Sequence, residues 1–438
     1  MLDLRFIADN LEAVKKNIAD RYMTADADLV VELFTRRTEL ATALQALQQR
    51  RNANAAAMKG KLEADVRQAL IDEGKKLKED IATAEAELAG AEAELDVAAR
   101  RIPNMAHPDA PAGREDKDNL EVKRVGKPAP FDFVPADHVQ LGQSLDIIDF
   151  DSATKVSGTK FYYLKNEGVF LELGLVRYAL DILQKKGFTP FITPDIAREE
   201  ILEGIGFNPR GSESNVYTLE ESDPRSARTC LVGTAEITLG GYYANTILPR
   251  DKLPIRMAGL SHCFRREAGA AGQFSKGLYR VHQFTKVEMF VCCLPEESGR
   301  FHEELRSVEE EIFSGLEIPF RVVDTCTGDL GAPAYRKWDL EAWMPGRANP
   351  LSRDGGEWGE VTSTSNCTDY QARRLNVRYK EDDGKNRFVH MLNGTAIAVS
   401  RAIIAILENF QQADGSVRLP KALVPYCGFE VIKRVPKD

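Results

Sequence analysis

Residues 264–290 read FRREAGAAGQFSKGLYRVHQFTKVEMF. We interpret it as two strands joined by a loop of small residues. Side chains alternate between the two faces of a strand, so the residues from Leu278 onward fall into two sets. The odd-numbered set is mostly apolar and fits a core: Tyr279, Val281, Gln283, Thr285, Val287, Met289 and Val291. The even-numbered set is Arg280, His282, Phe284, Lys286 and Glu288.

The polar set has two readings. A sheet that faces water on one side would show the same alternation. However, Arg265 and Glu267 share one parity just before the loop, and pairing of the two strands would bring them to the same face. Two arginines, two carboxylates and an aromatic ring around one spot suit a ligand that is anionic, flat and aminated.

Composition limits the classes of protein that fit. The chain has 438 residues and 43% hydrophobic residues, which is enough for roughly two or three globular domains. It contains no run of about 18 apolar residues, so no membrane span is expected. The N-terminus lacks the pattern of a secretory or transit signal, so we expect a cytoplasmic protein. The net charge is −9, so any binding of nucleic acid must come from a local patch.

Cysteine usage argues against a disulfide framework and a zinc site. The seven cysteines form no CxxC pair, and their number is odd. His262 and Cys263 are the one close His/Cys pair, and a zinc site built on them would need distant partners.

The N-terminal part carries heptad spacing typical of a helical hairpin. Gly60 separates two runs whose positions step by three and four residues. The second helix, about 40 residues long, would reach roughly 60 Å. The seam positions of the second run are Leu77, Ile81, Ala84, Leu88, Ala91, Leu95, Ala98 and Ile102, and those of the first are Leu33, Arg37, Leu40, Leu44, Leu47, Arg51, Asn54 and Met58.

Charge is uneven along this hairpin. Residues 50–78 hold eight basic and four acidic side chains, whereas residues 79–96 hold seven acidic and no basic ones. The pattern fits a solvated coiled coil with ordinary surface charge, and it also fits an arm that presents cations to phosphates. The charges alone slightly favour the first reading.

The remaining chain predicts an α+β domain. We expect residues 1–105 to form the N-terminal domain, the proline-rich residues 106–136 a linker, and residues 137–438 a domain on one large sheet. Arg401 lies in an otherwise apolar helical stretch, and a buried guanidinium needs a partner. The turn Asn393–Thr395 is expected to open that helix, where backbone N–H groups favour anions.

Two shorter segments add polar clusters. Thr234 and Glu236 lie two residues apart, which by itself indicates no more than a helix start. Glu360 is followed by hydroxyl residues, a set that suits magnesium or an ordinary polar turn. The chain has no GxxxxGK[ST] loop and no GxGxxG after a strand, so any nucleotide must bind by another scheme.

Together these segments resemble the class II aminoacyl-tRNA synthetases, and most closely the seryl-tRNA synthetases. The resemblance covers essentially the whole chain. Motif 1 of the class is similar to GFTPFITPDIA, residues 187–197, with Pro194 as its proline; motif 2 to the opening stretch; and motif 3 to LNGTAIAVSRAIIAILENFQ, residues 392–411. The linker resembles the family through IPN, HPDAP, EVKRVGKP and FDF. The resemblance implies a tRNA-binding hairpin arm followed by a catalytic domain on a large antiparallel sheet flanked by helices.

The resemblance implies an activity and its nucleotide contacts. The activity is serine–tRNA ligase: L-serine and ATP give seryl-adenylate and pyrophosphate, and the seryl group then passes to the 3′ end of tRNA(Ser). Arg265 would contact the α-phosphate and Arg280 another phosphate, while Glu267 would lie near the adenine amino group. Phe284 would stack on the adenine and Arg401 would cover its other face. The further ATP contacts implied are Arg266, Val281, Glu360, Val361, Thr362 and Ser363.

The same resemblance implies the metal and the serine contacts. Glu360 and Ser363 would bind magnesium, and no zinc is expected. Serine is small, so its hydroxyl must be read by buried polar groups. The serine-binding residues implied are Thr234, Ala235, Glu236, Arg265, Glu288, Asn393 and Thr395, with Glu236 at the ammonium.

The resemblance also changes the interpretation of the arm. In the family, the arm grips the long variable arm of the tRNA across a homodimer. It implies phosphate contacts from Arg36, Arg37, Arg50, Arg51, Lys59 and Lys61. The sequence leaves open whether tRNA(Sec) is a second acceptor.

Two features depart from the family pattern. Arg266 stands where the family more often has serine, and its strand parity predicts that it faces away from the site. The segment 345–359 is longer than usual and rich in glycine, which predicts a mobile flap before Glu360.

Two other functions stay open at this point. One is a homologue that loads an amino acid onto a carrier protein, although such homologues lack the arm. The other is a non-catalytic tRNA-binding dimer, which should have lost Arg265, Glu288 or Arg401.

Overall fold

The computed structural model describes residues 1–208, 214–220, 223, 227–268, 276–347 and 355–433. The chain divides into two compact units, Met1–Met105 and Ala106–Asp438. Among the described residues, no helix is both long enough and apolar enough to cross a membrane.

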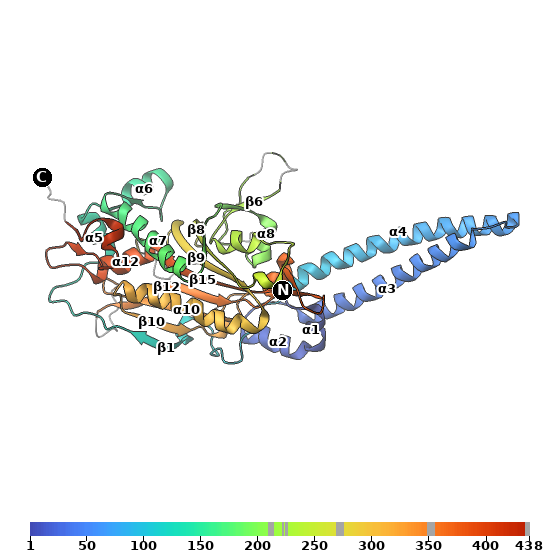
Figure 1. Cartoon of the computed structure of the whole chain (residues 1–438), viewed down its shortest axis with the longest axis horizontal. Coiled ribbons are helices and arrows are strands. Elements are labelled where there is room, and N and C mark those ends of the chain that lie inside the picture. Colours follow the sequence, from blue (N-terminus) through green and yellow to red (C-terminus); the bar gives the residue numbers. More distant parts are fainter. Residues whose placement is uncertain (209–213, 221–222, 224–226, 269–275, 348–354, 434–438) are drawn as a thin grey trace. The chain divides into compact units, whose positions relative to one another are not determined.

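The first unit is helical (Figure 1). Helices α1 (Leu4–Asp9) and α2 (Leu11–Asp20) precede the long pair α3 (Ala27–Ala57) and α4 (Ala64–Arg101), which lie side by side as the heptads predict. Leu77, Ile81, Ala91 and Leu95 of the predicted seam are buried in α4. Towards the end of α4 the buried position shifts from Ala98 to Ala99, because an α-helix drifts against a strict seven-residue repeat.

The second unit is built on an eight-stranded sheet. Its strands are antiparallel except for the edge pair β4 and β8, which is parallel. In sheet order they are β1 (Leu120–Val125), β10 (Phe320–Asp324), β11 (Arg336–Met344), β12 (Glu357–Asn366), β15 (His390–Ala398), β9 (Gln283–Cys293), β8 (Ile255–Phe264) and β4 (Thr189–Ile192). The predicted linker therefore contains a strand of this sheet, β1.

Smaller elements surround the sheet. The short strands are β2 (Ile148–Asp149), β3 (Tyr163–Leu164), β5 (Ile196–Arg198), β6 (Thr229–Leu231), β7 (Ile247–Leu248), β13 (Arg378–Lys380), β14 (Asn386–Phe388), β16 (Val417–Arg418) and β17 (Val431–Ile432). The shorter helices are α5 (His138–Ser144), α6 (Phe150–Ser157), α8 (Glu199–Ile205), α9 (Glu236–Gly241), α11 (Tyr370–Leu375) and α13 (Val424–Cys427).

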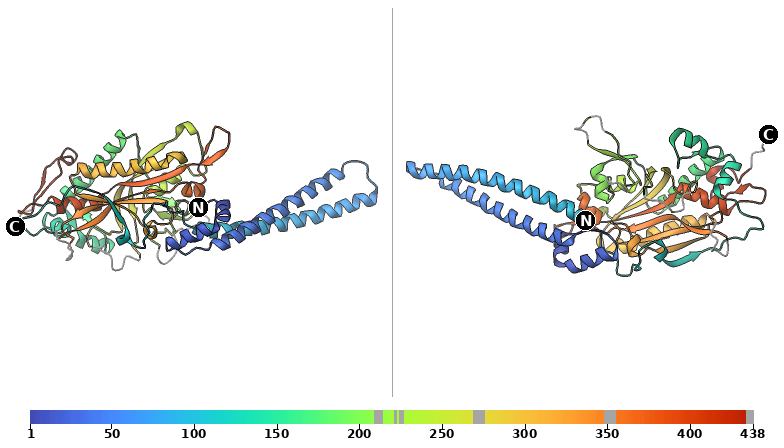
Figure 2. Two further views of the ribbon diagram at one scale, coloured as in Figure 1. Left: turned by 90° about the horizontal axis from the view of Figure 1, so that it is seen from below. Right: turned by 180° about the vertical axis from the view of Figure 1, so that it is seen from behind.

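The two faces of the sheet are covered differently. Helices α7 (Glu167–Lys185) and α10 (Ser298–Gly315) pack on one face, and Figure 2 shows α10 running along it. On the other face, α8, α9 and α11 enclose a second core that includes Phe290 and Cys292 of β9. The predicted alternation is confirmed, because Val287, Met289 and Val291 belong to the first core.

The structure moves two predicted boundaries. Strand β9 begins at Gln283 rather than Leu278, because residues 276–282 form turns. Strand β15 runs to Ala398, and helix α12 (Val399–Asn409) starts one residue later. The expected turn at Asn393–Thr395 is therefore wrong: these residues lie within a strand, where no helix N-terminus is available to an anion.

Candidate active site

A pocket opens on the polar face of β9, between the turn residues 279–281 and the start of α12. Ten of the residues singled out from the sequence line it: Arg265, Glu267, Arg280, Val281, Phe284, Glu360, Val361, Thr362, Thr395 and Arg401. Tyr279, Lys286, Ala398 and Ser400 complete the lining. Strands β8, β9, β12 and β15 thus bring segments more than a hundred residues apart to one place.

Three guanidinium groups and an aromatic ring stand at this pocket. The Arg265 guanidinium lies 5.3 Å from the centroid of the Phe284 ring, a cation–π distance. Arg280 forms an ion pair of 3.1 Å with Glu267. Arg401 pairs with the Glu360 carboxylate at 3.3 Å and donates to the Glu360 carbonyl at 2.9 Å. Such a set can bind a flat ring together with a polyanion.

Lys286 is the centre of a buried polar cluster beside the pocket. Its ammonium forms an ion pair with Glu288, and both side chains are almost fully buried. It also donates to the hydroxyls of Thr234 at 2.9 Å and Thr395 at 3.4 Å. Thr395 in turn donates to Glu288 at 3.3 Å. These contacts satisfy charges that would be costly to bury alone, and they present hydroxyl and carboxylate oxygens to a small polar ligand.

Glu236 extends this cluster towards a second cavity of about 290 Å³, which Ser365, Cys367 and Asn393 also line. One Glu236 carboxylate oxygen accepts hydrogen bonds from Gln371 at 2.7 Å and from Asn393 at 2.8 Å. Burial, with the nearby Glu288 charge, raises the pKa of Glu236 to about 7. Glu236 therefore changes charge within the physiological range.

A bulge in β12 brings two predicted metal ligands onto one face. Glu360 pairs with Glu341 of β11, and Ser363 pairs with Asp339, two residues away along β11. Alternate residues of a strand share a face, so the extra residue in β12 places Glu360 and Ser363 on the same side. Burial raises the pKa of Glu360, but the charges of Arg401, Lys337 and Arg265 outweigh that effect and keep its pKa below the ordinary value.

The predicted arm residues divide into two groups. Arg36, Arg37 and Arg50 form ion pairs with Glu94, Glu92 and Glu73 of the facing helix, at 3.4, 3.1 and 3.2 Å. Arg51, Lys59 and Lys61 are exposed near the turn of the hairpin. The first group is thus paired with acidic side chains across the hairpin, at exposed positions where ion pairs stabilise little.

Comparisons with known proteins agree with this architecture. Residues 1–106 match the family model "Seryl-tRNA synthetase N-terminal domain", and residues 217–410 match "tRNA synthetase class II core domain (G, H, P, S and T)". A curated Serine--tRNA ligase of Treponema denticola is 69% identical over 432 residues, covering 99% of this chain and 100% of the relative. The chain belongs to the seryl-tRNA synthetase family.

Solved structures of seryl-tRNA synthetases resemble the chain along its length. The enzyme of Pyrococcus horikoshii complexed with ATP gives a TM-score of 0.88 at 40% identity, covering all of both chains. The cytoplasmic serine–tRNA ligase of Naegleria fowleri with AMP gives 0.85 at 31% identity, covering 99% of each. These likenesses confirm the predicted family and the predicted class II fold.

Some residues expected in a seryl-tRNA synthetase site lie apart from the pocket. Arg266 is exposed and does not line it, as its strand parity predicted. Ala235 is fully buried in the second core. Of the glycine-rich segment 345–359, residues 348–354 lie outside the described residues, as do residues 269–275 of the predicted small-residue loop.

Besides Ala398 and Ser400, four residues of the site were not singled out as contacts from the sequence. Tyr279 was assigned to the core set and is buried in the first core, and its ring also belongs to the site, since its centroid lies 4.7 Å from the Arg401 guanidinium and 4.9 Å from that of Arg347. Lys286 had a usable signal, because its parity placed it on the polar face. Arg347 and Gln371 had none, because each meets the site through segments distant in sequence.

Proposed function

We propose that this chain activates L-serine with ATP and transfers the seryl group to tRNA(Ser). The observation that carries the proposal is the junction of the two halves of the site on β9. Phe284 and Arg265 stand at the pocket, and Lys286 and Glu288 lie two and four residues further along the same face. The relatives bear the name Serine--tRNA ligase, and one similar structure is described with ATP.

The nucleotide lies with its adenine on Phe284 and its phosphates against Arg265. The serine carboxylate attacks the α-phosphate and pyrophosphate leaves, so the protein has little covalent work to do. Its contribution is to place the two substrates and to hold cations where charge develops. Arg401 covers the other face of the adenine, Arg280 contacts a phosphate and Glu267 lies near the adenine amino group. The backbone of Val281 and the β12 residues Val361 and Thr362 border the nucleotide.

Glu360 and Ser363 fit a magnesium ion. A carboxylate and a hydroxyl on one strand face are oxygen donors of the kind that magnesium prefers, and such ions usually take their other ligands from water and substrate phosphates. Among the described residues, no cluster of three or more His, Cys, Asp or Glu could hold a metal ion. When bound, the ion neutralises charge on the phosphates.

Serine is recognised by the buried cluster. Ionised Glu236 binds the ammonium, and the hydroxyls of Thr234 and Thr395 with Glu288 receive the serine hydroxyl. Buried polar groups left unpaired by alanine or glycine would disfavour those amino acids. Asn393 holds Glu236 in place through its 2.8 Å hydrogen bond.

The arm binds the tRNA backbone. Arg51, Lys59 and Lys61 contact phosphates most directly, and Arg36, Arg37 and Arg50 contribute while paired with glutamates. Such contacts are salt-sensitive and largely blind to sequence. With tRNA as its acceptor, the protein works in the cytoplasm.

A homodimer fits the exposed edge of the sheet. Strand β4 is the last strand, and Ile192 on it is 86% exposed, with Phe170 and Leu173 of α7 more than half exposed. Edge strands with apolar side chains are normally covered, and a second copy offers the same surface.

An assay of serine transfer shows which molecule accepts the seryl group. Purified protein is given labelled serine, ATP and either tRNA(Ser), tRNA(Sec) or a carrier protein. Label on tRNA(Ser) is expected, and label on tRNA(Sec) would add a second substrate. Label on the carrier protein but on neither tRNA would contradict the proposal.

A further inference from the structure

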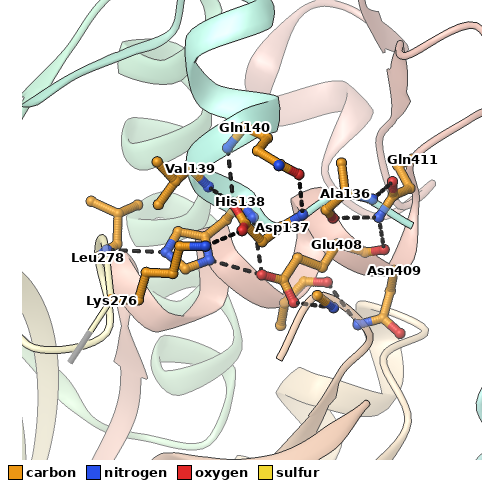
Figure 3. Close-up of polar contacts among 12 residues, drawn as sticks. Ala136, Asp137, His138, Val139, Gln140, Lys276, Leu278, Glu408, Asn409 and Gln411 are labelled. Atoms are coloured by element: carbon orange, nitrogen blue, oxygen red, sulfur yellow. Dashed lines mark hydrogen bonds and ion pairs between the residues drawn. The ribbon is translucent and has the colours of Figure 1, made fainter. Parts of the chain in front are cut away.

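A polar cluster, buried around His138 and Glu408, joins four segments that lie far apart in the sequence (Figure 3). We call it the His138 cluster; it consists of Asp137, His138, Lys276, Gly346 and Glu408. These residues come from the start of α5, the turn before β9, the end of β11 and the end of α12. None of them has a role in the proposed function.

Hydrogen bonds fix the protonation of His138. Its Nε2 accepts from the backbone N–H of Leu278 at 3.2 Å, and a backbone amide can only donate. The ring proton therefore sits on Nδ1, which donates to the Glu408 carboxylate at 2.8 Å. Both side chains are 2% exposed, so water does not compete for these bonds.

Glu408 ties this histidine to a second segment. Its other carboxylate oxygen accepts from the backbone N–H of Gly346 at 2.9 Å. Two glycines allow the close approach: a Cβ at Gly277 would lie 2.2 Å from Nε2 of His138, and one at Gly346 would lie 2.8 Å from Cδ of Glu408. The backbone at both places is therefore packed directly against the cluster.

Lys276 and Asp137 close the cluster on its outer side. The Lys276 ammonium forms an ion pair with Asp137, whose carboxylate also caps α5 by accepting from the N–H groups of Val139 and Gln140 at 2.9 and 3.0 Å. The turn before β9 is thus held at residue 276 and again at residue 278.

Each residue anchored by its backbone N–H group is next to a residue of the site. Leu278 precedes Tyr279, and Gly346 precedes Arg347, whose guanidinium lies 4.9 Å from the Tyr279 ring. Glu408 follows Arg401 by seven residues on α12, so the two lie about two turns apart on one side of that helix. The other contact of the Tyr279 ring is Arg401 itself, at 4.7 Å.

We propose that His138 and Glu408 are positioning residues for the nucleotide half of the site. Their hydrogen bonds hold the backbone beside Tyr279 and Arg347, whose side chains contact each other, and the Tyr279 ring in turn fixes where the Arg401 guanidinium meets ATP. Neither residue touches the substrate. The proposal rests on the proposed function, since it assigns the cluster to the ATP subsite and not to the serine subsite.

Paired substitutions separate positioning from general stability. His138→Ala removes both hydrogen bonds, whereas His138→Asn keeps an N–H donor near the place of Nδ1. Tyr178→Phe is the matched control, because it removes a buried hydrogen bond to the Ile312 carbonyl, 3.2 Å long, outside the cluster. Each variant is assayed well below its unfolding temperature, by serine-dependent ATP–pyrophosphate exchange and by calorimetric titration with ATP.

The expected result is a selective loss. His138→Ala lowers kcat/KM for ATP by about 100-fold, the cost of a small misplacement in a site. The KM for serine stays unchanged, His138→Asn restores most of the loss, and Tyr178→Phe behaves as wild type. The proposal is overturned if folded His138→Ala keeps wild-type kinetics, if KM rises equally for serine and ATP, or if Tyr178→Phe loses as much.

Two further arms keep the test decisive. If His138→Ala does not fold, His138→Asn is compared with Glu408→Gln, which puts an amide in place of a carboxylate that accepts on both oxygens. Glu408→Gln is then expected to lose more activity than His138→Asn. Equal activity of the two variants overturns the proposal. If wild-type protein shows no exchange, the proposed function fails. Weaker ATP binding by His138→Ala in the titration would then still support positioning, and unchanged binding would refute it.

Discussion

Arg401 shows what a single buried guanidinium does in this site. It is held by Glu360 and by the Tyr279 ring, so its position is fixed before any ligand arrives. We expect Arg401→Ala to lower the rate of adenylate formation by about 100-fold, because ATP loses the guanidinium that covers its adenine and is held less precisely. The measurement is serine-dependent exchange, with binding of tRNA measured beside it. Arg418→Ala, an exposed arginine on β16, is the control. Equal loss of exchange and of tRNA binding would contradict the assigned role.

Glu236 gives the site a pH dependence. Its pKa is about 7 in the folded protein, whereas an ordinary glutamate has a pKa of 4.5. The ionised form binds ammonium, so kcat/KM for serine should fall below pH 7 by about tenfold for each pH unit. Glu236→Gln should flatten this limb of the profile. A wild-type profile that stays level from pH 8 down to pH 5.5 would refute the assignment.

The same raised pKa affects stability with a definite sign. A carboxyl whose folded-state pKa lies above its unfolded value favours folding in the protonated form. The penalty for ionising Glu236 therefore grows between pH 4.5 and about 7 and is then constant. Serine offsets it by supplying a positive charge, so the stabilisation by serine should be larger at pH 8 than at pH 6.

At the scale of elements, the arm separates two kinds of basic residue. Arg51→Ala, Lys59→Ala and Lys61→Ala in one variant should weaken tRNA binding and lower the slope of log K against log salt by about 2–3, since each phosphate contact contributes about one. Arg36→Ala with Arg37→Ala is the matched variant, because those side chains are paired with glutamates. Serine-dependent ATP–pyrophosphate exchange should be unchanged in both arm variants. A larger loss of tRNA binding in the Arg36/Arg37 variant would show that the paired arginines contact the tRNA more than the exposed residues do.

The sequence predicts best those elements in which a regular hydrophobic pattern continues over many residues. The hairpin follows from heptads over some seventy residues, and the face of β9 follows from strict alternation. The ends of elements are harder to predict from the sequence. The local sequence at Gly394 predicts a helix start, but Gly394 lies in β15, where strand pairing with Thr364 and Met289 overrides the turn signal. The bulge of β12 has no clear local signal, because it is defined by its pairing with β11.

The residues of the candidate site that could be predicted are those that lie on a strand with a regular alternation of apolar and polar side chains. Phe284 and Glu288 could be assigned to one face from alternation alone, and Arg265 could be added on the expectation that the two strands pair. Gln371 could not, because its contact with Glu236 bridges 135 positions and depends on how α11 packs. The core assignment of Tyr279 is confirmed, but its contact with Arg401 was not predicted, because residues 276–282 lie outside β9 and alternation does not say what their side chains meet.

For the whole molecule, the open edge of the sheet predicts self-association. Ile192→Asp should shift a dimer towards monomer, because a carboxylate would enter the apolar surface formed around β4. Light scattering across a range of protein concentrations measures the change. Val134→Asp provides a control, since Val134 is also exposed but lies outside the edge strand. An unaltered dimer in Ile192→Asp would place the interface elsewhere.

The central claim is that one pocket activates serine and discriminates by its hydroxyl. The most direct measurement is ATP–pyrophosphate exchange with serine, run beside threonine, alanine, glycine and cysteine. We expect exchange with serine and far weaker exchange with the other four. Exchange with alanine or glycine at the serine rate would contradict the proposed reading of the hydroxyl, and no exchange with any amino acid would contradict the assignment of the pocket as an adenylate-forming site.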